Sequence, residues 1–308
     1  MSTSDLSVKV GELTFANPIM PASGTFSEDL SDVFDLDVLG AHVLKTIMHG
    51  KRAGNPTPRV CDLQGGMLNA IGIPSKGIDD FRDRMLPYWS DYKAPLVVSI
   101  SAHSMDEFAR LAAEVSLPGV AAIEANISCP NIEADGNAFA MRPDTTAEVM
   151  RRLRAETDLP LWAKLTPNTG EPVAVALAAE AEGADAIVTA NTALGMSIDV
   201  RTRQPRLGNV MGGMSGPAVK PIALRMTYQC AHACRVPVIG CGGIATLDDV
   251  LEFLIAGAAA VQVGTATFQS PTVMARLIAE LSDWMQAQGV TSLGEIIGSV
   301  QIPGGEAA

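Results

Sequence analysis

The chain has 308 residues, of which 47% are hydrophobic and 18% charged, so it can bury a large core and is not expected to be disordered. Its formal net charge of −12, without any run of basic residues, argues against binding to nucleic-acid phosphates. The polar start "MSTSDLSVKV" is unlike a signal peptide, and Gly, Pro or charged residues interrupt every apolar stretch before it reaches membrane-spanning length.

The five cysteines are odd in number and contain no CxxC pair, which favours reduced thiols and a cytoplasmic location. Cys230 and Cys234 are one helical turn apart. We expect them to be packed helix thiols and not metal ligands, because no second pair of ligands accompanies them. The sequence therefore predicts no metal site.

Short apolar, β-rich segments alternate with helical patterns along the chain. The predicted strands are residues 17–23, 41–46, 95–101, 121–128, 161–167, 186–192, 236–243 and 260–266. The predicted helices are residues 105–115, 145–157, 172–182, 217–233, 247–256 and 272–286. Most of the strands are apolar on both faces, as parallel strands covered by helices are. This alternation predicts an α/β fold, a (β/α)₈ TIM barrel, that forms one domain over residues 1–308.

Three additions to the barrel are predicted. Residues 8–18, "VKVGELTFANP", read as an N-terminal β-hairpin that turns at Gly11-Glu12 and closes the floor of the barrel. The connections after the second and sixth strands, residues 48–77 and 193–215, are too long for simple turns. Such insertions are often lids or binding loops.

Barrel enzymes carry their chemistry at the C-terminal ends of the strands, and polar residues gather there in this sequence. They are Ser23, Lys45, Thr46, Ser99, Ser101, Asn126, Lys164, Asn191 and Thr192. Two lysines and two asparagines converging on one barrel mouth predict a functional site, because buried charges and amides are costly unless they are paired.

The turns after the seventh and eighth strands contain Gly242-Gly243 and Gly264-Thr265. Free backbone N–H groups at such turns bind anions, and in this fold these two loops commonly bind phosphate. They predict a phosphorylated substrate or a phosphorylated cofactor such as FMN. Lys164, the one charge in "LWAKLTP", would then stabilise the anionic reduced flavin. The alternative is a lysine that extends to solvent.

Several segments together resemble dihydroorotate dehydrogenase, and most closely its class 1B catalytic subunit. They are "NPIMPASGTF", "GNPTPR", "GGMLNAIGIPSKG", "NISCPN", "AKLTPN", "LGNVMGGMSGPAVKPIALR" and "VIGCGGIATLDDVLEFLIAGAAAVQVGTA". The resemblance implies FMN in the barrel mouth and the oxidation of dihydroorotate to orotate in pyrimidine synthesis. It implies that Cys129 takes a proton from C5 of the substrate while a hydride leaves C6 for flavin N5. The membrane-attached class has serine in place of this cysteine and an additional N-terminal membrane helix.

The resemblance also implies roles for individual residues. The substrate contacts are Lys45, Asn69, Asn126, Asn131, Asn191 and Thr192. The FMN contacts are Ala22, Ser23, Lys45, Thr46, Asn126, Lys164, Gly216, Gly242, Gly243, Gly264 and Thr265. The sequence departs from the family at Pro74-Ser75-Lys76, where an amide-bearing residue is common. This departure bears on substrate binding and not on the fold. Cys61 matches no functional position of the family.

The same resemblance implies NAD⁺ as electron acceptor, reached through a separate subunit that carries FAD and a 2Fe–2S cluster. A homodimer of this chain would join that subunit in a heterotetramer. No four closely spaced cysteines that could hold the cluster occur in this chain.

Three other functions fit the sequence less well. In dihydropyrimidine dehydrogenase, Pro-His-Gly follows the cysteine, whereas this chain has Asn131 two residues after it. A dihydrouridine synthase needs a basic surface for RNA, and a non-catalytic flavin scaffold would not need Cys129, Asn69 and Asn191 together.

Overall fold

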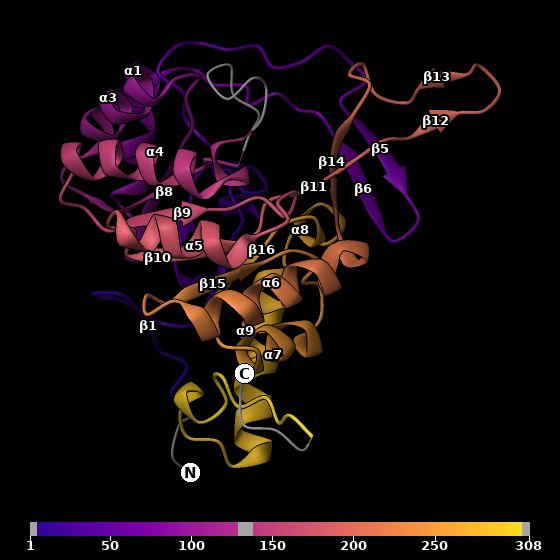
Figure 1. The fold of residues 1–308 in the computed structure, drawn as a ribbon. Coiled ribbons are helices and arrows are strands. Elements are labelled where there is room, and N and C mark those ends of the chain that lie inside the picture. Colours follow the sequence, from indigo (N-terminus) through magenta and orange to yellow (C-terminus); the bar gives the residue numbers. More distant parts are fainter. Residues whose placement is uncertain (1–4, 129–137, 304–308) are drawn as a thin grey trace.

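The structure, a computed structural model, describes residues 5–128 and 138–303. Eight of the described strands form a parallel, nearly closed barrel in the order β3-β16-β15-β10-β9-β8-β7-β4 (Figure 1). They are β3 (Ile19–Pro21), β4 (His42–Val43), β7 (Leu96–Ile100), β8 (Val120–Ala125), β9 (Leu161–Lys164), β10 (Ala186–Thr189), β15 (Val238–Cys241) and β16 (Ala258–Val263). At the seam between β3 and β4, the Gly40 N–H donates to the Ile19 carbonyl at 2.9 Å. The predicted (β/α)₈ barrel is confirmed, and each of its strands lies within or overlaps a predicted segment.

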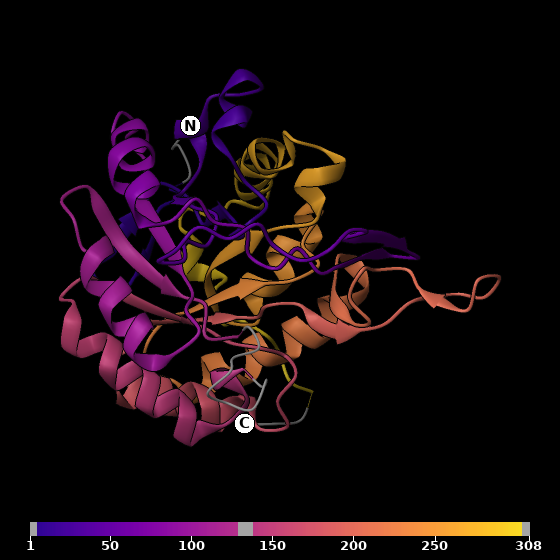
Figure 2. The same ribbon diagram turned by 90° about the horizontal axis from the view of Figure 1, so that it is seen from above.

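Helices surround the barrel (Figure 2). The longer ones are α3 (Met105–Val115), α4 (Pro143–Glu156), α5 (Pro172–Ala181), α6 (Lys220–Ala233), α7 (Leu247–Ile255) and α9 (Val273–Gln288). In α3, Ser104 accepts a hydrogen bond from the Glu107 N–H as the N-cap, and Phe108, Leu111 and Val115 are buried at helical spacing. All six helices were predicted, within a few residues at their ends.

Further short helical segments lie between these elements. They are η1 (Glu28–Asp32), η2 (Leu36–Val38), α1 (Ile78–Asp80), η3 (Phe81–Met85), α2 (Leu86–Trp89), η4 (Phe139–Met141), η5 (Pro217–Val219), α8 (Ala266–Gln269) and η6 (Leu293–Glu295). The consecutive α1, η3 and α2 form the helical layer between β4 and β7, which was not predicted. Its charged stretch "DDFRDRM" is followed by Pro87, and both features obscure the helical pattern.

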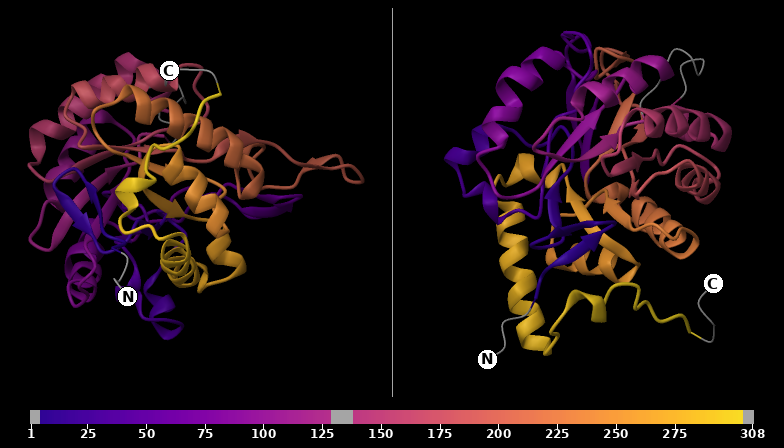
Figure 3. Two further views of the ribbon diagram at one scale, coloured as in Figure 1. Left: turned by 90° about the horizontal axis from the view of Figure 1, so that it is seen from below. Right: turned by 90° about the vertical axis from the view of Figure 1, so that its left-hand side faces the viewer.

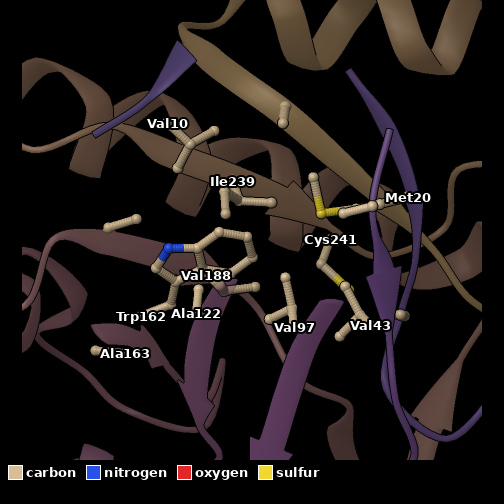
Figure 4. Packing of buried hydrophobic residues seen from close by; sticks show 14 of the residues in the cluster. Val10, Met20, Val43, Val97, Ala122, Trp162, Ala163, Val188, Ile239 and Cys241 are labelled. Carbon is tan, nitrogen blue, oxygen red and sulfur yellow. The ribbon is translucent and has the colours of Figure 1, made fainter. Parts of the chain in front are cut away.

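The core fills the interior of the barrel with inward-facing side chains of successive strands (Figure 4). Trp162 is fully buried among them, and Phe15 of the N-terminal hairpin contacts it edge-on, with ring centroids 6.1 Å apart. The hairpin consists of β1 (Val8–Val10) and β2 (Leu13–Phe15), joined at Gly11-Glu12 as predicted. Figure 3 shows it from below, against the end of the barrel that it closes.

The two insertions pair with each other, which was not predicted. The strands β5 (Val60–Leu63), β6 (Gly66–Asn69), β11 (Ala193–Gly195) and β14 (Gly212–Ser215) form an antiparallel sheet in the order β11-β14-β6-β5. We call it the insertion sheet. Beyond it, β12 (Ile198–Asp199) and β13 (Gln204–Pro205) form a hairpin that projects away from the barrel (Figure 1). Within the described ranges, no helix is long and apolar enough to cross a membrane.

Candidate active site

Three polar side chains meet where β8 and β10 end. The Ser128 hydroxyl donates to Asn126 Oδ1 at 2.6 Å. The Asn191 side-chain amide donates to Ser128 Oγ at 2.6 Å and to Asn126 Oδ1 at 3.2 Å. Asn126 and Asn191 therefore lie together as predicted. Ser128, which links them, was not predicted as a site residue, although it lies in the quoted motif "NISCPN".

The insertion sheet brings Asn69 and Thr192 to the same strand. Asn69 Nδ2 donates to the Gly213 carbonyl at 3.3 Å. A Cβ atom added to Gly213 would overlap the Thr192 hydroxyl. One residue of β14 thus contacts predicted substrate residues from two segments far apart in the sequence.

A pocket lies at the other end of β14. It is lined by Gly216, Pro217, Gly243, Ile244, Ala245, Thr265, Ala266 and Gln269. The backbone N–H groups of Gly243, Ile244 and Thr265 donate to no acceptor in the described part of the chain. Both turns predicted to bind phosphate therefore line one pocket and offer it free donors.

Glycine is required at several points around this pocket. Gly216 and Gly243 have φ of 99° and 77°, and a Cβ on either would lie 2.7 Å from a neighbouring carbon, of Gly66 and Lys220 respectively. A Cβ on Gly242, whose φ is 137°, would likewise lie 2.7 Å from the Cβ of Ala223. The backbone can thus approach a bound group closely, and the residues fit the phosphate of a cofactor.

Asp249 fixes the turn beside the pocket. Its Oδ2 accepts from the N–H groups of Ala245 and Thr246 at 2.9 and 2.8 Å, and its Oδ1 accepts from Lys220 Nζ at 2.7 Å. Burial acts to raise the pKa of Asp249, but Lys220 and the two N–H groups hold it below the ordinary value. The ionised carboxylate therefore stabilises the turn through Ala245 and Thr246 and leaves the N–H groups of Gly243 and Ile244 available.

Lys164 lies inside the barrel, where it contacts Gln262 and Glu124. Its Nζ donates to Gln262 Oε1 at 2.9 Å and lies 3.4 Å from Glu124 Oε1. Its side chain is only 4% exposed, so the alternative of a lysine extending to solvent is wrong. The sequence did not reveal its partners, because Glu124 and Gln262 lie 40 and 98 residues away from it.

The second predicted lysine lies over the first strand end. Lys45 Nζ is 3.6 Å from the position of a Cβ on Gly24, which follows Ala22 and Ser23. The hydroxyls of Thr46 and Ser99 are hydrogen-bonded at 3.0 Å. Across the same edge, a Cβ built on Gly264 would lie 3.5 Å from the Cβ of Ala22. Ala22, Lys45 and Thr46 thus lie at the ends of β3 and β4, with Gly264 at the adjoining end of β16.

The remaining sequence predictions differ in outcome. Cys129 and Asn131 lie outside the described residues, so their roles stay predictions. Ser75 Oγ accepts from the N–H groups of Met48 and Gly77 at 3.2 and 3.1 Å, so the departure at Pro74–Lys76 anchors the first insertion. Cys61 is buried against Leu68 and Leu207 between the two insertions.

Cys230 is a buried thiol of α6, as predicted. The prediction of a helix thiol is wrong for Cys234, which is half-buried and has extended backbone directly after the helix ends at Ala233. Burial raises the pKa of Cys230 to about 12 and that of Cys234 to about 11, which leaves both protonated near neutral pH. Over residues 5–128 and 138–303, His, Cys, Asp and Glu side chains form no group that could hold a metal ion.

Comparison with known proteins places the chain. The family model described as dihydroorotate dehydrogenase matches residues 5–285. The chain belongs to the dihydroorotate dehydrogenase family. That family assignment agrees with the (β/α)₈ barrel.

Its relatives include proteins named dihydroorotate dehydrogenase B (NAD(+)), catalytic subunit. The one from Trichlorobacter lovleyi is 44% identical over 299 residues, which are 96% of this chain and 98% of that protein. The one from Desulforudis audaxviator is 44% identical over 301 residues, 97% of this chain and 98% of that protein. The one from Geobacillus kaustophilus is 45% identical over 296 residues, 95% of each.

Proposed function

We propose that this chain is an FMN-dependent catalytic subunit that oxidises dihydroorotate to orotate in pyrimidine synthesis. The observation that carries the proposal is that three features lie together at the mouth of the barrel. They are the Asn126–Ser128–Asn191 amide cluster, the buried Lys164 and the glycine-lined pocket with free N–H donors.

The proposed cofactor fits the residues of the mouth. Its phosphate would be held by the N–H groups of Gly243, Ile244 and Thr265, in the space kept open by Gly216 and Gly243. Lys164 would supply a fixed positive charge that favours the reduced state. When bound, FMN supplies the acceptor for the hydride that leaves C6 of dihydroorotate.

The proposed substrate suits the amides and hydroxyls of the opposite side. Dihydroorotate has alternating C=O and N–H groups, and side-chain amides can both donate and accept. We assign these contacts to Lys45, Asn69, Asn126, Asn131, Asn191 and Thr192. Cys129 removes the proton from C5 as general base, which requires the thiolate in reach of that carbon.

The cofactor assignment is tested by acid extraction of the purified chain followed by chromatography. The expected product is FMN, with about one molecule per chain. Recovery of FAD, or of no flavin after reconstitution with FMN, would overturn it.

The proposal extends to the electron acceptor and the assembly. Relatives named as NAD(+)-linked catalytic subunits support NAD⁺ as final acceptor and the presence of a partner subunit. We assign FAD and a 2Fe–2S cluster to that partner, as the resemblance of the sequence implies. A homodimer of this chain would form the core of the heterotetramer. The composition supports a cytoplasmic location, which stays a prediction.

A rate measurement separates these roles. The isolated chain should take up electrons from dihydroorotate but turn over poorly with NAD⁺, and the added electron-transfer subunit should restore NAD⁺ reduction. A full rate of NAD⁺ reduction by the isolated chain would show that this assignment of the acceptor pathway is wrong.

A further inference from the structure

A polar layer crosses the barrel just below its mouth. Glu124 of β8, Lys164 of β9 and Gln262 of β16 point inward, and Glu124 and Gln262 are fully buried. Beneath this layer the barrel is filled by apolar side chains such as Trp162 and Ile239 (Figure 4). Since β8 and β16 are separated by three strands in the sheet order, the contact between Glu124 and Gln262 spans the barrel interior.

The three side chains contact one another. Gln262 Nε2 donates to Glu124 Oε2 at 2.6 Å, and Gln262 Oε1 accepts from Lys164 Nζ at 2.9 Å. Lys164 Nζ also faces the second carboxylate oxygen of Glu124, at 3.4 Å. Both oxygens of Glu124 therefore face donors, as expected for an ionised carboxylate. The amide of Gln262 has its orientation fixed, because an ammonium can only donate.

The layer also contains a thiol, which contributes no further charge. Cys241 of β15 is the ladder neighbour of Gln262. Burial raises the pKa of Cys241, while Lys164 acts to lower it and Glu124 acts to raise it. The thiol is therefore neutral near neutral pH and adds no charge to the layer.

We propose that Glu124, oriented by Gln262, is a positioning residue that holds the Lys164 ammonium in place and, as its counter-charge, limits how strongly that lysine favours the reduced cofactor. This inference rests on the proposed function. Neutralising Glu124 leaves the lysine cation without its opposing carboxylate. The reduced, more negative state of bound FMN is then stabilised further and the reduction potential rises.

The test is the reduction potential of bound FMN, measured by anaerobic equilibration with reference dyes, in a set of matched variants. Glu124→Gln should increase the preference for reduced over oxidised FMN about tenfold relative to wild type. For a two-electron couple this corresponds to a rise of the reduction potential by about 30 mV. Lys164→Gln should lower the potential. The double variant, which removes both charges, should lie between wild type and Lys164→Gln. Glu124→Asp keeps the carboxylate and should stay near wild type.

The pair of variants without the lysine keeps the test valid if Glu124→Gln fails to fold. In that background, loss of the Glu124 charge must still raise the potential, which loss of packing alone would not do. Equal potentials in Lys164→Gln and the double variant, or a fall in Glu124→Gln, would overturn the inference. A wild type that binds no FMN would overturn the proposed function itself, and so the two failures are distinguishable.

Discussion

Cys129 is the residue to which we assign removal of the C5 proton. An unperturbed thiol has a pKa of about 8.5, so part of it is thiolate near neutral pH. A positioned base contributes about 100- to 10,000-fold to a rate. Cys129→Ala should therefore slow flavin reduction by dihydroorotate by an amount in this range, measured by stopped-flow absorbance, while FMN and orotate still bind.

Two further variants sharpen this prediction. Cys129→Ser should retain some activity and shift the pH profile upward, because a hydroxyl is a much weaker acid than a thiol. Cys234→Ala, which removes a half-buried thiol just after α6, should reduce its flavin at the wild-type rate. The role of general base is refuted if Cys129→Ala keeps the wild-type rate at every pH.

Site residues were predictable where they stand at the ends of strands. Asn126, Lys164 and Asn191 could be located from the strand pattern, because every strand of a parallel barrel ends at the same mouth. Glu124 and Gln262 could not, since each lies inside a strand and only the closure of the barrel brings them to Lys164. The link between Asn126 and Asn191 through Ser128 also depends on the three-dimensional arrangement.

At the scale of elements, β14 connects the two halves of the site. Its first residues contact Asn69 and Thr192, and Ser215 at its other end accepts a hydrogen bond from the Thr265 hydroxyl at 2.8 Å. Gly216, which follows, lines the pocket proposed for phosphate. A displacement of this strand therefore disturbs the substrate side and the cofactor side together.

Gly213→Ala tests this role of β14. The added methyl group overlaps the Thr192 hydroxyl, so either Thr192 or the strand must move. We expect orotate to bind about tenfold more weakly, a loss of about 1.4 kcal/mol, which spectral titration of the FMN-loaded protein would measure. Gly170→Ala, at an exposed glycine with open space around its Cβ position, is the control and should bind orotate normally. Unchanged orotate affinity in Gly213→Ala would show that β14 does not position the substrate residues.

Helices and barrel strands were predictable because local patterns define them. Apolar residues at helical spacing and caps such as Ser104 fix the helices, and short apolar runs fix the strands. The insertion sheet was not predictable. Its strands "GMLN" and "GGMS" are rich in glycine, which is depleted in strands, and their ladder joins residues about 145 positions apart, such as Gly213 and Asn69.

For the whole molecule, His42 links stability to pH. It lies fully buried next to the rings of Phe26, Trp89 and Tyr92, and its Nε2 is 2.9 Å from the Leu36 carbonyl. Its Nδ1 has no hydrogen-bond partner in the described structure. Burial lowers the pKa of His42, although the Leu36 carbonyl and the nearby charge of Asp37 act to raise it.

This direction fixes the sign of the pH effect. Above about pH 6.5 the imidazole is neutral in both states and contributes nothing to the pH dependence. Below that pH the unfolded chain takes up a proton that the folded chain does not, so the free energy of unfolding falls until the folded pKa is reached. This group can contribute a fall of up to about 1.4 kcal/mol per pH unit.

Urea unfolding at pH 7, 6 and 5 measures this effect. His42→Gln should lose less stability between pH 7 and 5 than wild type does. His232→Gln, at an exposed histidine, should follow the wild-type dependence. If His42→Gln loses as much stability as wild type over this range, His42 does not control it.

The single-domain organisation over residues 1–308 stays a prediction. The parts that the structure does describe agree with it: the N-terminal hairpin packs on Trp162, and the Leu293 side chain is fully buried in the same core. The proposed chemistry depends on which compound binds at the mouth of the barrel and is oxidised there.

The most direct measurement is an anaerobic titration of the purified, FMN-loaded chain with dihydroorotate, followed by flavin absorbance. We expect the oxidised-flavin band to be lost in proportion to the dihydroorotate added, and dihydrouracil, which lacks the carboxylate, to leave the band intact. A band unchanged by dihydroorotate in folded, FMN-loaded protein, or one lost with dihydrouracil alone, would show that the proposed function is wrong.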